Sequence, residues 1–287
     1  MTAKEINAKA LNFLDKQEWK KAQDLFFKNA KENPSHQTYN NLGFFLIIEG
    51  LICSNGKVRN ALKLGNKYLF KARQFKITTV NTLAIITSFD RMLRSEKEDK
   101  ALLYASACEV LKDSLKREYF VQIHYNLLRF LYLSQPQNKL LLEETEKLLN
   151  RFVCQESVFL NLCVLSQNNM IDKMKKQLSK HAELLDEYDR FAFYLKAQMY
   201  EEAYALCKNI YQSYEIDDFI RCAISECYIK TGRKKELTSI IKLTDDFYTK
   251  NNVSSYREKV IKNYQFIPPI LESCAYFGCD MHNVKWD

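Results

Sequence analysis

The sequence predicts an all-α protein, and three observations support this prediction. The 287 residues include only six glycines and four prolines, where average usage would give roughly twenty and fourteen. The tight turns of sheet proteins need residues that tolerate positive φ, so this content is too low for a sandwich, a barrel or a doubly wound sheet. Apolar residues recur at spacings of three and four along almost the whole chain, and short polar clusters interrupt the pattern.

The composition and the termini narrow the class of protein. Hydrophobic residues make up 47% and charged residues 27%, so the chain can bury a full core and is not disordered. Its longest apolar run, around residues 44–52, contains Glu49 and Gly50 and is too short for a transmembrane helix. The N-terminus lacks the apolar stretch of a secretory signal, so we expect a cytoplasmic protein.

Nine scattered cysteines among apolar neighbours favour reduced thiols that act as small hydrophobes. The net charge of +8 permits an anionic partner without requiring one.

The apolar spacing predicts a succession of helical hairpins. Each expected helix carries apolar residues at helical spacing and is bounded by a polar cluster or a breaker. Pro34 ends the second helix, and Gly232 directly follows the helix expected over residues 217–231.

 The expected helices are 4–16, 19–32, 37–50, 58–75, 78–94, 99–116, 119–133, 140–152, 157–167, 172–185, 189–198, 200–214, 217–231 and 234–249, with two shorter ones at 255–264 and 269–277.

Residues 1–34 combine small residues, aromatics and a final proline in a regular order. These are Ala10, Trp19, Ala22, Phe26 and Pro34. The small residues let the two helices of a hairpin approach closely, and the aromatics fill the space beside them. This pattern resembles the tetratricopeptide repeat (TPR), and the next segment, 39–43, supplies the Tyr-Asn-Asn-Leu-Gly of that family's first helix.

Weaker copies follow at irregular intervals, around residues 81–84, 124–128, 159–163, 200–207 and 223–233. The resemblance implies about seven helical hairpins over residues 1–250, wound into a right-handed α-α superhelix. Residues 251–287 would form capping helices and a tail. Between residues 77 and 190 the repeat boundaries stay open, and a generic α-solenoid is the alternative there.

In the TPR family the first helices line a concave groove that accepts an extended peptide. The groove positions carried onto this sequence hold an asparagine in each of five successive repeats, with apolar residues beside them. They are Asn7, Asn40, Asn41, Asn81, Asn126 and Asn161, with Phe44, Ile85 and Phe130. Because a carboxamide both donates and accepts, we expect the row to pair with the main chain of a partner segment. The alternative is that it reflects an asparagine-rich composition.

A basic stripe follows the helix expected at 58–75. Arg59, Lys63, Lys67 and Lys71 are four residues apart and share one face. Like charges at this spacing cost roughly 0.2–0.5 kcal/mol per pair. The stripe is either a solvated outer face or a surface for an acidic protein, a phosphate backbone or an anionic membrane.

The C-terminal residues depart from the repeat pattern, and we expect them to cap the last hairpin. The spacing Cys274-x4-Cys279-x2-His282 could bring three soft ligands together. A structural zinc site needs a fourth ligand, so we expect neither a metal site nor a cofactor.

The sequence lacks a glycine-rich phosphate loop, H-E-x-x-H, G-x-S-x-G and paired C-x-x-C motifs. We therefore expect a non-enzymatic scaffold that captures a protein or peptide segment in a TPR-like groove. Three alternatives stay open: an RNA-binding helical-repeat protein that uses the basic stripe, a stand-alone peptide-sensing regulator, and a self-associating assembly subunit.

Overall fold

The structure is a computed structural model that describes residues 1–53, 58–94, 99–236 and 254–286. Within these ranges the chain is all-α, and the helices pack against their neighbours in sequence order. This confirms the predicted fold class and its organisation in helical hairpins. Each described helix is too short or too polar to cross a lipid bilayer.

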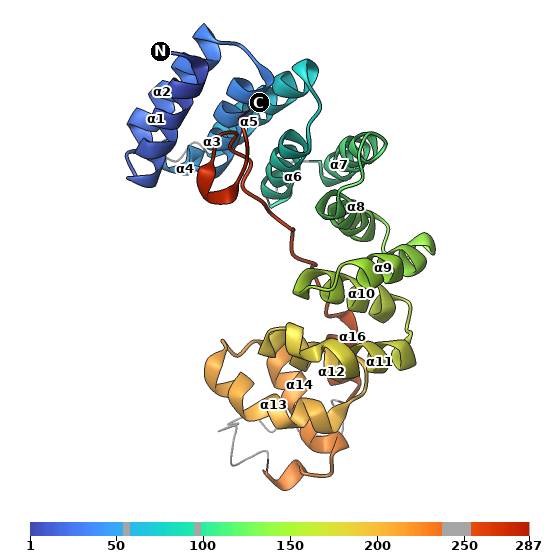
Figure 1. The fold of residues 1–287 in the computed structure, drawn as a ribbon. Coiled ribbons are helices and arrows are strands. Elements are labelled where there is room, and N and C mark those ends of the chain that lie inside the picture. The colour runs from blue at the N-terminus through green and yellow to red at the C-terminus, as the bar shows by residue number, and fades with distance from the viewer. Residues whose placement is uncertain (54–57, 95–98, 237–253, 287) are drawn as a thin grey trace. The chain divides into compact units, whose positions relative to one another are not determined.

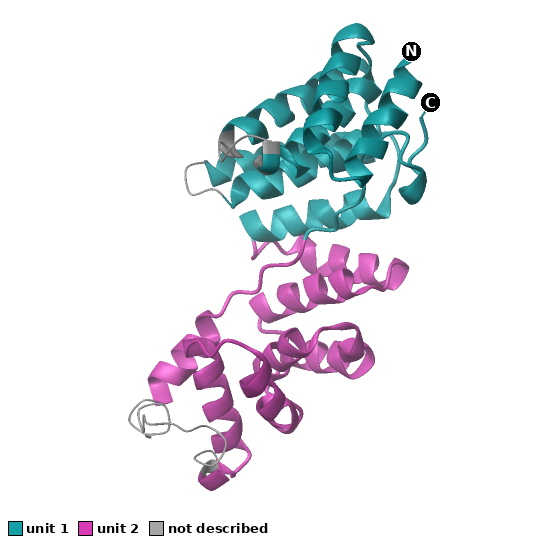
Figure 2. Cartoon of the chain, turned by 90° about the vertical axis from the view of Figure 1, so that its left-hand side faces the viewer, with its two compact units in different colours: residues 1–135, 270–287 teal, residues 136–269 magenta. Residues whose placement is uncertain are grey.

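The chain forms two compact units (Figure 2). Unit 1 contains Met1–Gln135 together with Ile270–Asp287, and unit 2 contains Pro136–Pro269. This division differs from the expected array over 1–250 with a cap over 251–287. The last residues belong with the first hairpins, because their hydrogen bonds are made to helices near the N-terminus.

Unit 1 consists of hairpins around one apolar core. Its helices are α1 (Ala3–Asp15), α2 (Trp19–Glu32), α3 (His36–Ile48), α4 (Gly50–Cys53), α5 (Val58–Phe75), α6 (Thr79–Leu93), α7 (Lys100–Leu115) and α8 (Val121–Ser134). Thr2 and Ser35 close capping boxes at the starts of α1 and α3. The hairpin residues Ala10, Ala22 and Phe26 are fully buried in this core.

Helices α3 and α5 approach closely at two glycines. A Cβ atom on Gly43 would lie 2.9 Å from the Gly65 carbonyl oxygen, and one on Gly65 would lie 2.9 Å from the Gly43 carbonyl oxygen. Any side chain at either position would therefore force the two backbones apart.

Unit 2 continues the hairpin pattern. Its helices are α9 (Leu140–Arg151), α10 (Gln155–Gln167), α11 (Ile171–His181), η1 (Ala182–Leu184), α12 (Glu187–Lys196), α13 (Tyr200–Ser213), α14 (Asp218–Lys230), η2 (Lys234–Glu236) and α16 (Ser254–Asn263). Helix α16 packs on α14. The helix expected at 234–249 lies outside the described residues beyond η2.

The chain after α16 is extended rather than helical. Residues 264–276 form no helix, so the short helix expected at 269–277 is wrong. A short apolar run fits an extended segment as well as a helix, and each residue that precedes a proline, here Ile267 and Pro268, favours extended backbone. In unit 2, Phe266 stacks on Phe193 with ring centroids 4.0 Å apart, and Tyr264 stacks on Phe219 at 3.8 Å.

Candidate functional site

Residues 270–286, called the C-terminal segment below, lie against the first hairpins of unit 1 (Figure 1). Asn41 of α3 pairs with both main-chain groups of Phe277. Its Nδ2 donates to the Phe277 carbonyl oxygen at 2.8 Å, and its Oδ1 accepts from the Phe277 N–H at 2.8 Å. Asn7 of α1 donates to the same carbonyl at 2.8 Å and accepts from Asn41 Nδ2 at 2.6 Å. The two asparagines therefore hold one residue of the segment through its backbone.

A second contact lies two residues earlier in the segment. Asn40 Nδ2 donates to the Ala275 carbonyl oxygen at 2.6 Å. Asn40 Oδ1 accepts from Asn81 Nδ2 at 3.2 Å, and Asn81 also donates to the Leu69 carbonyl at 2.9 Å. Asn81 thus supports Asn40 from behind and joins α6 to α5.

Asn126 of α8 repeats the two-sided pairing farther along the segment. Its Nδ2 donates to the Leu271 carbonyl oxygen at 3.1 Å, and its Oδ1 accepts from the Leu271 N–H at 3.3 Å. Gln122, one helical turn earlier, accepts from the Ser273 hydroxyl at 2.9 Å. Asn7, Asn40, Asn41 and Asn126 are all buried, so these bonds are shielded from competing water.

Aromatic contacts hold the side chains of the segment. The ring of Tyr276 is stacked on Phe26, with centroids 5.8 Å apart, and meets Phe44 edge-on at 4.8 Å. Phe277 meets the ring of His36 at 5.4 Å. Burial raises the pKa of the Tyr276 hydroxyl well above its usual range, so the phenol stays neutral where it lies.

A cavity of about 660 Å³ remains beside the segment. Leu11 and Leu14 of α1 and Phe44 and Ile48 of α3 supply apolar walls, and the segment supplies another wall through residues 272–282. The C-terminal segment therefore covers only part of the surface formed by these helices.

The other predicted site residues lie elsewhere. In unit 2, Asn161 donates to Thr145 Oγ1 at 3.3 Å and bonds its own hairpin. Ile85 and Phe130 are fully buried in the core of unit 1, where they support the helices.

The basic stripe is solvent-facing where it is described. Lys63, Lys67 and Lys71 are exposed, and the Lys71 ammonium lies 4.2 Å from the centroid of the Tyr39 ring. The side chain of Arg59 lies outside the described residues.

Sequence reasoning missed the partner of the asparagines and the contact that Gln122 makes with Ser273 of the segment. The available signal in the sequence was the apolar run Ala275-Tyr276-Phe277 outside the repeats, since such a run needs a surface to cover it. The structure buries all three residues.

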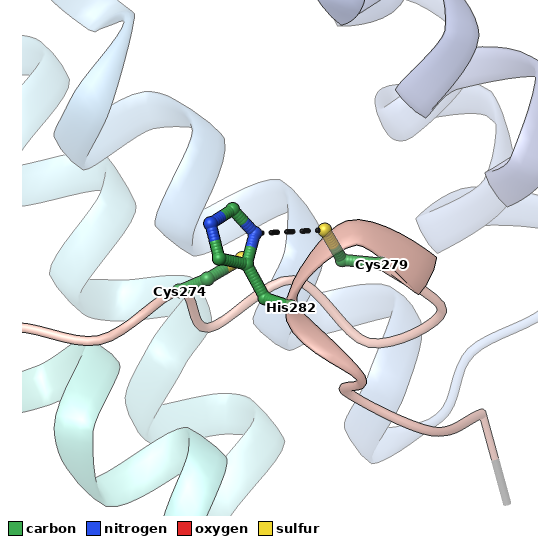
Figure 3. Close-up of side chains that lie close together, drawn as sticks. All are labelled: Cys274, Cys279 and His282. Atoms are coloured by element: carbon green, nitrogen blue, oxygen red, sulfur yellow. Dashed lines mark hydrogen bonds between the residues drawn. The ribbon is translucent and has the colours of Figure 1, made fainter.

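Cys274, Cys279 and His282 of the C-terminal segment gather at the cavity wall (Figure 3). Cys279 Sγ lies 3.2 Å from His282 Nδ1, and the ligand atoms of all three lie within 4.8 Å of one another. The turn that carries them is closed by Gly278 N–H to the Val284 carbonyl at 2.8 Å and Val284 N–H to the Cys279 carbonyl at 3.0 Å. The backbone thus fixes the spacing of Cys279 and His282.

In the described part of the chain the cysteines are free thiols, Cys274 and Cys279 among them. Burial raises the pKa of the Cys274 thiol to about 11. The thiol is therefore protonated at neutral pH in the metal-free chain.

Comparison with known proteins does not identify a family for this chain. No protein-family model matches the chain, and no curated protein sequence matches it.

Proposed function

We propose that this protein is a non-enzymatic, TPR-like scaffold that binds an extended segment through the segment's main chain, and that its own C-terminal segment is the resident occupant. One observation carries the proposal: Asn41 and Asn126 each pair with the N–H and the C=O of a single residue of the C-terminal segment, which is non-helical over residues 270–276 and turns at Phe277. A partner segment with the same backbone form would take the place of residues 270–279.

The chemistry of the contacts supports a general peptide-binding surface. A carboxamide that hydrogen-bonds to a backbone N–H and C=O makes no contact with the side chain, so this interaction does not depend on the sequence of the bound segment. Selectivity then comes from the aromatic pocket around Tyr276, formed by Phe26 and Phe44. A partner with an aromatic residue at the matching position fits this pocket best.

The covalent link gives the resident segment an advantage over any competitor. A tethered segment acts at about millimolar effective concentration, so about 10 μM of an equally good free peptide would occupy only about 1% of the sites. Free peptide should therefore bind well only after the resident segment has been weakened.

The test uses the full chain with Tyr276→Asp, which places a carboxylate in the aromatic pocket and disfavours docking of the resident segment. A fluorescent peptide with the native sequence of residues 268–286 is titrated by anisotropy, with chelator and reducing agent present. We expect the variant to bind the peptide about 100-fold more tightly than the wild-type chain does.

Two further variants separate groove binding from nonspecific binding. Adding Asn41→Ala to Tyr276→Asp should abolish peptide binding, whereas adding Asn150→Ala, an exposed position on α9, should leave it unchanged. Circular dichroism checks that all variants keep their helices. Equal peptide affinity in the wild type and Tyr276→Asp, or retention of binding without Asn41, would refute the proposal.

A further inference from the structure

The cluster of Cys274, Cys279 and His282 has the dimensions of a metal site. In a tetrahedral zinc site, Zn–S bonds of about 2.3 Å and Zn–N bonds of about 2.0–2.1 Å place neighbouring ligand atoms about 3.3–3.8 Å apart. The three ligand atoms here lie within 4.8 Å of one another, and the pair Cys279 Sγ and His282 Nδ1 lies at 3.2 Å. A movement of about 1 Å would bring the observed distances between ligand atoms to those of a tetrahedral site. The side chain of His282 is exposed and has room to move.

The donor set selects a borderline-soft cation. Two thiolates and one imidazole are ligands that Zn²⁺ prefers, whereas Mg²⁺ and Ca²⁺ prefer oxygen. Asp15, Glu272 and Asp280 line the same cavity, so the local charge favours a cation although the whole chain carries +8.

We propose that Cys274, Cys279 and His282 form a Zn²⁺ site with three protein ligands, whose fourth coordination position is taken by water or by a donor from a bound partner. As the two Zn–S bonds form, each thiol loses its proton to solvent, so one Zn²⁺ binds with the release of two H⁺. The inference does not depend on the proposed peptide-binding function.

The position of the ligands gives the metal a structural effect. Cys274 precedes the Phe277 contact with Asn41, and Cys279 and His282 follow it in the turn. A bound ion would therefore link the residues before Phe277 to those after it and would stabilise the turn between them. Zn²⁺ should protect the C-terminal segment from proteolysis.

The experiment is a titration of the full chain, stripped of metal with a chelator and kept reduced, with Co²⁺ as a spectroscopic probe. We expect one equivalent to produce a thiolate-to-cobalt charge-transfer band and the visible bands of tetrahedral Co²⁺, and one equivalent of Zn²⁺ to abolish both. Cys274→Ser and Cys279→Ser should each weaken binding by more than the roughly 10- to 100-fold lost with an outer-shell partner.

His282→Ala keeps the test independent of folding, because its side chain is exposed. It should weaken Co²⁺ binding while the circular dichroism spectrum stays unchanged. Cys154→Ser and His181→Ala are matched controls outside the cluster and should bind as the wild type does. A reduced wild-type chain without a charge-transfer band, or a band that persists in Cys279→Ser, would overturn the proposal. Since no peptide is present, its failure leaves the peptide experiment unaffected.

Discussion

Asn41 hydrogen-bonds to both main-chain groups of Phe277 and to Asn7. Its replacement by alanine should therefore release the C-terminal segment. Asn41→Ala removes two hydrogen bonds to Phe277 and one to Asn7, all between 2.6 and 2.8 Å. The Phe277 carbonyl keeps its bond from Asn7 Nδ2. The Phe277 N–H and Asn7 Oδ1 lose these partners in a buried environment.

The expected cost follows from those two groups. Each buried polar group left without a partner costs about 1–3 kcal/mol, so the docked segment loses about 2–6 kcal/mol. Even the lower value raises the population of the undocked segment about 30-fold. The helices of unit 1 keep their apolar core, so the effect is local opening rather than global unfolding.

Hydrogen–deuterium exchange by mass spectrometry over residues 270–279 measures this opening. We expect exchange at least about 30-fold faster in Asn41→Ala, with Asn150→Ala matching the wild type. Unchanged exchange in a folded Asn41→Ala chain would refute the reasoning that main-chain pairing holds the segment.

Three further predictions concern stability, each measured by urea denaturation. Gly65→Val should destabilise the chain by about 1–3 kcal/mol through overpacking, because its Cβ would lie 2.9 Å from the Gly43 carbonyl; an unchanged midpoint would contradict the close approach. Burial and the neighbouring Asp186 carboxylate raise the pKa of Asp189 to about 7. The folded chain then holds more protons than the unfolded chain between about pH 4 and 7, so the unfolding free energy falls as pH rises through this window. Asp189→Asn should remove that contribution, and identical pH profiles would argue against it. Arg129→Ala should cost about 3 kcal/mol, since Asp90 loses a buried partner at 2.6 Å; a neutral result would show that Asp90 is satisfied without it.

The helical part of the fold follows from local signals. Spacings of three and four place Ala10, Ala22 and Phe26 on buried faces, and the structure agrees. Gly43 belongs to the Tyr-Asn-Asn-Leu-Gly run of the repeat pattern, and the structure places it where α3 touches α5. These features depend on residues that are near one another in sequence or belong to one hairpin, so periodicity can reveal them.

The candidate site was only partly predictable. The groove positions included Asn7, Asn40, Asn41 and Asn126, whose carboxamides bond to the main chain of the C-terminal segment. The sequence could not show which segment they bond, because these contacts join residues 145–270 positions apart, where no local pattern applies. Asn161 shows the limit of positional transfer, since its carboxamide serves its own hairpin. The spacing of Cys274, Cys279 and His282 was visible, but their closeness depends on how the turn folds.

The contact between Asn7 and Phe277 spans 270 residues, and this separation has a consequence for synthesis of the chain. At about 5–20 residues per second, a ribosome needs about 15–55 s between making the two residues. During that interval the first hairpins can fold, while their asparagine carboxamides still lack the C-terminal segment to which they bond in the full chain. Under the proposed function, the newly made N-terminal hairpins would present these carboxamides to other extended chains until residues 270–279 have been synthesised.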